Sequence, residues 1–149
     1  MSTDSESYES VLAVWDYYDG PRSGIAMYRD APHVFRSLGL DEESDSTDDV
    51  FLLQPIEPDT LALALEDWHI WVRWRAANLA GEAPPGSHPA LPVDRSRHEV
   101  LRSLLADRLV TPGAVIYARA TFRGQLPDRG TLEVRWVTLT PWRVIGPPA

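Results

Sequence analysis

The sequence lacks two residue types altogether, cysteine and lysine, and each absence excludes a class of chemistry. Without cysteine there is no thiol nucleophile, iron–sulfur cluster, cysteine-ligated zinc site or disulfide framework. All 14 basic residues are arginines, which excludes a phosphate-binding loop ending in Gly-Lys-Ser/Thr and a Schiff-base lysine. A GC-rich coding sequence replaces lysine by arginine without any functional cause, and we favour that explanation.

Long apolar runs and targeting signals are also missing. No stretch approaches the ~18 apolar residues that a membrane span needs. Residues 1–10 are acidic and polar, without the basic and apolar regions of a signal peptide. We therefore expect a soluble, cytoplasmic protein that does not contact membranes.

The length of 149 residues suits one domain spanning 1–149. A chain of this size buries enough surface to be stable without a metal or disulfide. Three segments stand apart from its core pattern. They are a frayed acidic tail (1–9), an acidic loop (41–49) and a proline-rich strap (82–92).

The net charge of −8 is unevenly spread along the chain. Residues 1–67 hold 16 acids and three arginines, which gives −13, whereas residues 68–149 hold six acids and 11 arginines, which gives +5. The acidic balance argues against binding of duplex nucleic acid. The asymmetry predicts an acidic face for a basic protein partner, unless folding mixes the two halves in space.

Alternating apolar residues predict six strands, and two helical segments lie between the fourth and fifth. We expect the first helix to be capped by Asp59 or Thr60, and the second to open with a capping box of Ser96 and Glu99. The order ββββααββ favours an α+β fold, a mostly antiparallel sheet of about six strands with both helices packed on one face. The expected strands are 11–18, 25–29, 33–38, 50–55, 114–123 and 132–140.

The faces of these elements can also be predicted. In the first strand, Trp15 and Tyr17 share a face with Val11 and Ala13. In the fifth strand, one face is formed by Ala118, Ala120 and Phe122, and we expect it to meet the long helix. That helix is apolar on two sides, which is typical of a helix sandwiched in the core.

The long helix also carries the tryptophans, with arginines between them. Tryptophan and arginine are enriched at interface hot spots, but Trp68 lies on one apolar stripe and Trp71 on the other, which equally predicts core packing. Trp71 and Arg75 share a flank at i, i+4. On the polar side, Glu66, His69 and Arg73 lie one turn apart, and we interpret them as helix-surface pairs. The second helix is expected to bury Val100, Leu101, Leu104, Leu105 and Leu109.

The turn after the first strand reads Tyr-Asp-Gly-Pro-Arg-Ser-Gly over residues 18–24. It resembles a hairpin of a family of uncharacterised bacterial proteins that share this stretch. The later His-Pro-Ala-Leu-Pro stretch, residues 88–92, is similar to the same group. The resemblance covers most of the chain and implies no activity, substrate or cofactor.

This turn is also the candidate binding site. Loops on a rigid scaffold are where binding groups usually lie, and an arginine fork beside tyrosine holds a carboxylate or phosphate well. Alternatively, the aspartate caps the turn and the arginine pairs with Asp16 or Asp19 on the surface. We predict a partner-binding groove with one wall at the turn and its far side on the long helix, formed by Tyr18, Asp19, Arg22, Trp71 and Arg75.

Catalytic motifs are absent from the sequence. No histidines pair at i, i+4, no Gly-x-Ser-x-Gly elbow is present, and the acidic loop fails the EF-hand spacing. We therefore expect no metal and no cofactor, and favour a non-enzymatic intracellular binding or accessory protein, such as an immunity-like inhibitor that docks a basic protein. The alternative is a small acid/base hydrolase using Asp16, Asp19 and His69, because catalytic partners meet only in the fold.

Overall fold

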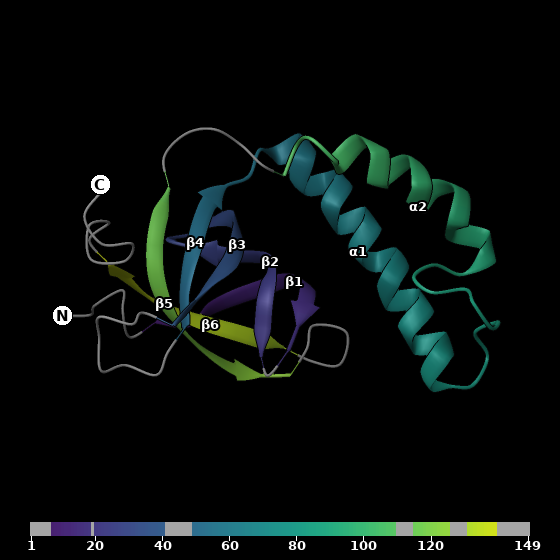
Figure 1. Ribbon diagram of the computed structural model, residues 1–149, viewed down its shortest axis with the longest axis horizontal. Coiled ribbons are helices and arrows are strands. Elements are labelled where there is room, and N and C mark those ends of the chain that lie inside the picture. Colours follow the sequence, from purple (N-terminus) through teal and green to yellow (C-terminus); the bar gives the residue numbers. More distant parts are fainter. Residues whose placement is uncertain (1–6, 19, 41–48, 110–114, 126–130, 140–149) are drawn as a thin grey trace. The chain divides into compact units, whose positions relative to one another are not determined.

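The computed structural model describes residues 7–18, 20–40, 49–109, 115–125 and 131–139. Six strands and two helices follow one another in the predicted order ββββααββ (Figure 1). The α+β class and the antiparallel pairing of the strands are confirmed. The chain forms two compact units, Met1–Pro55 with Thr111–Ala149, and Ile56–Val110. The predicted packing of the helices on the sheet concerns how these units meet, and it stays a prediction.

The first unit is a closed barrel in which every strand pairs with its neighbours in sequence order. The sheet closes on itself through a short pairing of β1 with β6, in which Glu9 lies opposite Val134 and Ser10 opposite Glu133. The strands are β1 (Glu9–Tyr17), β2 (Pro21–Tyr28), β3 (Ala31–Leu40), β4 (Asp49–Pro55), β5 (Ile116–Gly124) and β6 (Leu132–Leu139). β1 therefore begins inside the segment 1–9 that was expected to be a tail.

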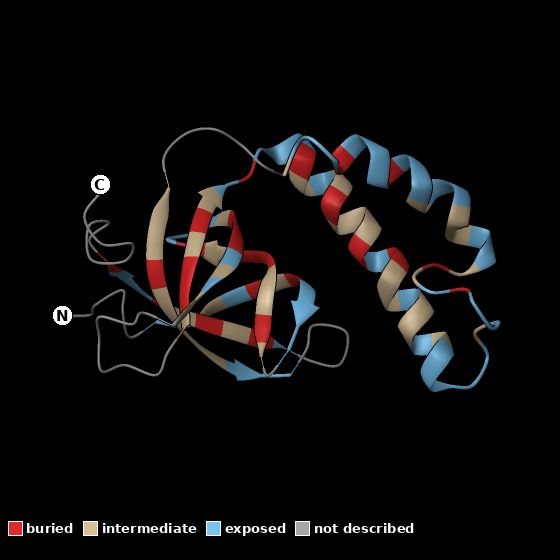
Figure 2. Cartoon of the chain, viewed as in Figure 1, coloured by how far each residue is buried: buried red, intermediate tan, exposed pale blue. Residues whose placement is uncertain are grey.

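Four aromatic rings from four strands fill the barrel. Phe35, Phe51, Phe122 and Trp136 contact one another with ring centroids 5.8–6.2 Å apart, the separation that aromatic pairs prefer. Figure 2 shows buried residues alternating with more exposed ones along the strands. The closed sheet turns the face of Phe122 inward around these rings. Its predicted contact with the long helix concerns how the two units meet, so it stays a prediction.

β1 does not keep the regular alternation that its sequence predicts. Its register with β2 shifts between Val11 and Ala13, and twice more before Tyr17. Such bulges interrupt the alternation of faces, so Val14 is buried while Trp15 and Tyr17 are exposed. The predicted common face of Val11, Ala13, Trp15 and Tyr17 is therefore wrong.

A close approach of backbones requires glycine opposite this bulged strand. A Cβ atom at Gly24 of β2 would overlap the carbonyl oxygen of Ala13. The next turn joins β2 to β3 at the predicted place, with positive φ at Arg29 (51°) and Asp30 (66°). The carboxylate of Glu9 accepts hydrogen bonds from both of their backbone N–H groups, at 3.2 and 3.1 Å, and so fixes the start of β1 to this turn.

The second unit is a helical hairpin of α1 (Pro58–Leu79) and α2 (Pro92–Leu105). Both helices begin with proline in the first turn and have no side-chain cap, because the fixed φ of proline already suits that position. The predicted caps at Asp59 or Thr60 and at Ser96 are therefore wrong, and α2 begins four residues before Ser96. No helix within the described ranges is long and apolar enough to cross a membrane.

The hairpin has a small core of its own, formed by Ile70, Ala90 and Leu101 with Leu63 packed against it. On α2 only Leu101 and Leu105 are buried, whereas Val100 and Leu104 are exposed, so the buried stripe is narrower than predicted. Ala90, in the proline-rich strap, is fully buried. The strap is thus an integral part of this unit.

Candidate functional site

The β1–β2 turn is held in place by Arg22. Its Nε donates a hydrogen bond to the backbone carbonyl of Tyr18 at 2.7 Å, and its guanidinium forms an ion pair with Asp49, the first residue of β4. Arg22 therefore ties the turn to a strand far away in the sequence. Of the two carboxylates proposed as its surface partner, Asp16 instead accepts a hydrogen bond from the hydroxyl of Ser23 at 2.9 Å. Asp19 lies outside the described residues, so its pairing stays a prediction.

Large aromatic side chains are exposed where β1 enters the β1–β2 turn. Tyr18 is 79% exposed, Tyr17 59% and Trp15 38%. Exposed large apolar groups are informative when they lie together, because an isolated one is ordinary on any surface. Three of them within four consecutive positions define a patch, which we call the hairpin patch (Trp15, Tyr17 and Tyr18).

The other wall of the predicted groove lies on α1. The ring of Trp71 stacks on that of Trp68, with centroids 4.9 Å apart and planes at 23°. The guanidinium carbon of Arg75 lies 5.4 Å from the centroid of Trp71, within the range of a cation–π contact. The sequence prediction that Trp71 and Arg75 lie together is confirmed.

The two predicted walls belong to different units. Tyr18 and Arg22 are in the barrel, whereas Trp71 and Arg75 are in the helical hairpin. The structure therefore describes each group of residues by itself, and the groove between them stays a prediction. The same holds for the acid/base alternative, because Asp16 lies on β1 and His69 on α1.

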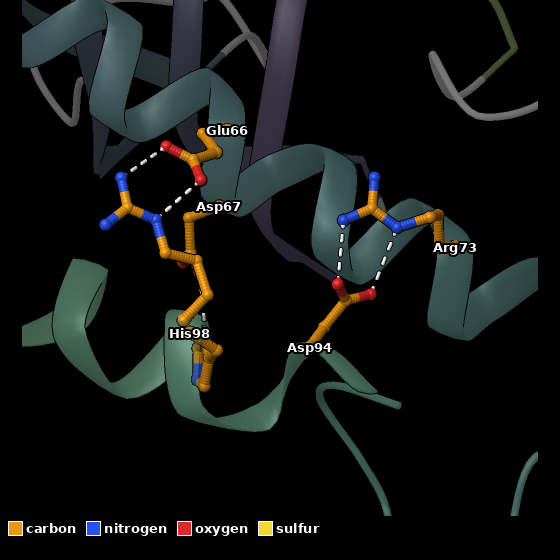
Figure 3. A network of polar contacts seen from close by, with 6 residues as sticks. Glu66, Asp67, Arg73, Asp94 and His98 are labelled. Atoms are coloured by element: carbon orange, nitrogen blue, oxygen red, sulfur yellow. Dashed lines mark hydrogen bonds and ion pairs between the residues drawn. The ribbon is translucent and has the colours of Figure 1, made fainter. Parts of the chain in front are cut away.

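Polar residues predicted to pair along the surface of α1 pair instead with α2 (Figure 3). Arg73 donates two hydrogen bonds of 3.0 Å to the carboxylate of Asp94. Arg97 donates two, of 2.6 and 2.8 Å, to the carboxylate of Glu66. The predicted helix-surface pairing of Glu66, His69 and Arg73 is confirmed only as a charge interaction between Glu66 and Arg73. Both residues form their hydrogen bonds with α2, and His69 is exposed.

The electrostatics of these bridges follow from their geometry. The hydrogen bonds from Arg97 lower the pKa of Glu66, because they stabilise the ionised carboxylate. The hydrogen bond to Glu66 likewise raises the pKa of Arg97, and that to Asp94 raises the pKa of Arg73. These charged groups are occupied with one another, so we interpret the network as a structural link between the helices and not as a reaction centre.

A histidine adds a third link. Nδ1 of His98 on α2 lies 2.7 Å from the carboxylate of Asp67 on α1 (Figure 3). In the part of the chain that the structure describes, no three histidine or carboxylate side chains are grouped to hold a metal. The acidic segment 41–48, the other feature considered for cation binding, lies outside the described residues.

Comparison with known proteins supplies no further assignment: no protein-family model, curated protein or solved structure matches the chain. The assignment of a candidate site therefore depends on the geometry alone. The hairpin patch is the most exposed part of that site. Sequence reasoning found Tyr18 but missed Trp15 and Tyr17, which simple alternation assigned to the face of Val11 and Ala13. Nothing in the sequence marks the bulges that turn them outward.

Proposed function

We propose that this protein is a non-enzymatic binding protein, and that the hairpin patch docks a partner protein with a basic surface. The observation that carries the proposal is the exposure of Trp15, Tyr17 and Tyr18 on one short segment. Tyrosine and tryptophan are enriched in the core of interfaces and among the residues that dominate binding energy. They contribute large, rigid contact areas at low cost in conformational entropy.

The charge that we propose for the partner follows from Asp16 and from the acidity of this part of the sequence. Asp16 is exposed between Trp15 and Tyr17, and the first 67 residues carry a large excess of acidic over basic residues. A carboxylate among aromatic anchors, in an acidic segment of the chain, favours a basic partner and speeds its association. An immunity-like inhibitor of a basic protein fits this description.

Arg22 supports the patch from behind in this proposal. Its guanidinium is engaged by Asp49 and by the carbonyl of Tyr18, so we assign it to positioning the turn and not to contacting the partner. The aromatic anchors would then be presented on a fixed backbone, which lowers the entropic cost of binding.

The test is site-specific photo-crosslinking from the native chain, followed by affinity measurement with the partner so identified. A photoreactive phenylalanine analogue replaces Tyr18, and the matched control carries it at Val93, which is 86% exposed on α2. We expect one dominant, basic adduct from position 18 that is absent from position 93. The purified partner should then bind at least ~10-fold more weakly to the Tyr17→Ala, Tyr18→Ala double variant.

Two results would contradict the proposal. One is an identical set of adducts from both positions, which indicates random collision. The other is unchanged affinity of the double variant for the purified partner, with Val93→Ala as the reference for a neutral surface change. Raising the salt concentration should slow association, because charge complementarity acts mainly on the association rate.

A further inference from the structure

The strap between α1 and α2 forms a shallow pocket with the first turns of α2, entirely within the helical unit. It has a volume of about 410 Å³, within the range of small-molecule sites. Its walls are polar and apolar in about equal parts, and two polar side chains of α2 reach it, Arg95 and Ser96. The remaining lining residues belong to the strap and the start of α2: Pro84, Pro85, Gly86, Ser87, Ala90 and Pro92.

The walls of this pocket are held by several contacts. The indole N–H of Trp74 donates to the hydroxyl of Ser87 at 2.8 Å, and this hydroxyl donates to the carbonyl of Pro84 at 2.6 Å. The ring of His88 packs edge-on against Trp74, with centroids 4.6 Å apart. Because Ala90 is also fully buried, the strap is fixed from both ends before any ligand arrives.

Arg95 supplies the positive charge of this pocket. One terminal nitrogen of its guanidinium donates to the backbone carbonyl of Ser87 at 2.9 Å, which orients the side chain along the pocket wall. No carboxylate within the described ranges pairs with it, although its neighbour Asp94 pairs with Arg73 and Arg97 pairs with Glu66. It thus differs from the arginines that link the two helices, since its remaining N–H donors are not taken up by an acid.

An arginine fork in a pocket walled partly by proline rings has a defined chemical preference. Its parallel N–H groups match the two oxygens of a carboxylate or phosphate, and the proline rings offer flat apolar surface to the body of a ligand. We propose that this pocket binds a small molecule that carries one oxyanion, a carboxylate or a phosphate, on a compact apolar group. The oxyanion pairs with Arg95, and the hydroxyl of Ser96 provides a further donor.

The site is independent of the proposed partner-binding function, because it lies on the helical unit and shares no residue with the hairpin patch. The experiment is a titration of the full, isotopically labelled chain with benzoate and with phenyl phosphate, followed by amide NMR. Benzamide is the neutral reference for benzoate. We expect saturable shifts of the amides of Gly86, Ser87 and Ser96 with the two anions, and much weaker effects with benzamide.

Variants separate the charge from the shape of the pocket. Arg95→Gln should weaken anion binding by roughly tenfold or more, and Arg95→Lys by less, because it keeps the charge but loses the fork. Arg102→Gln, an exposed arginine of the same helix outside the pocket, should bind as the wild type does. A preference for phenyl phosphate over benzoate, or the reverse, identifies the oxyanion.

Three outcomes would overturn the proposal. They are the absence of saturable shifts in the wild-type chain, equal binding of benzamide and benzoate, and an equal loss in Arg102→Gln and Arg95→Gln. The wild-type titration decides the question even if Arg95→Gln loosens the strap, and a thermal melt of each variant shows whether it does.

Discussion

The indole N–H of Trp136 on β6 donates a hydrogen bond of 3.0 Å to the backbone carbonyl of Met27 on β2. These two strands do not pair with each other, because β1 lies between them in the barrel. β1 and β6 pair over only two residues on each strand. The bond from Trp136 therefore supports the barrel where its strand pairing is shortest.

Replacing Trp136 by phenylalanine should destabilise the protein by about 2–4 kcal/mol, because it removes this hydrogen bond and leaves space among the aromatic rings. Urea unfolding followed by circular dichroism measures the change. Trp15→Phe, at an exposed position of β1, is the matched control and should stay within about 0.5 kcal/mol of the wild type. If Trp136→Phe and Trp15→Phe lowered the free energy of unfolding equally, the hydrogen bond to Met27 would not contribute measurably to stability.

Gly24→Ala should lower the stability of the fold more than an ordinary glycine substitution does. Gly81, just after α1, has φ of 75° but open space where a Cβ would lie, so Gly81→Ala should cost about 1–2 kcal/mol from backbone strain alone. At Gly24 the new methyl group also overlaps the carbonyl oxygen of Ala13, and the strands must move apart. Thermal melts of the two variants compare these costs, and a smaller loss for Gly24→Ala would contradict the close approach.

Acid should weaken the link between α1 and α2. The pKa of Glu66 is lowered in the folded chain by the hydrogen bonds from Arg97. Its contribution to stability is thus fully present above its unfolded pKa, and is lost as the pH falls through the lower, folded value. Glu66→Gln should therefore melt below the wild type at neutral pH, and the difference should shrink when both are melted at acidic pH. If the difference in melting temperature did not depend on pH, the ionised form of Glu66 would not be what stabilises the link between the helices.

Arg22→Ala should separate stability from binding. The side chains of Arg22 and Asp49 are 29% and 20% exposed, and a partly solvated ion pair of this kind contributes at most about 1 kcal/mol. The melting temperature should therefore fall only slightly. Affinity for the crosslinked partner should fall more, because Tyr18 loses the hydrogen bond that fixes its backbone. Arg36→Ala, at an exposed position of β3, is the control, and global unfolding of Arg22→Ala would assign this residue to the fold alone.

The order of the elements could be predicted because it depends on local patterns. The alternation around Phe122 and the apolar stripes of α1 both repeat at intervals of two to four residues. β5 and α1 are found where these patterns predict them. Closure of the sheet could not be predicted, since it depends on a pairing of two residues per strand between the first and last strands. The first residues of the helices could not be predicted from capping patterns, because both helices begin at a proline, Pro58 and Pro92, whose fixed φ replaces a side-chain cap.

The candidate site was only partly predictable for the same reason. Arg22 was recognised from its turn, but its partner Asp49 lies 27 positions further along the chain. Glu66 and Arg97 are 31 residues apart, and no i, i+4 rule reaches that far. Contacts of this kind depend on which elements become neighbours, and local periodicity carries no information about that.

The insertion of the helical unit between β4 and β5 has a consequence for the order of events during synthesis. The hairpin of α1 and α2 is continuous in the chain, so it can form as soon as its own residues have left the ribosome. The first four strands must wait for β5 and β6, because neither edge of the sheet finds its neighbour until residues beyond 110 have been made. During that interval the inner face around Phe35 and Phe51 is open to water and to other chains, which makes a nascent chain stalled inside the helical unit the species most prone to aggregate.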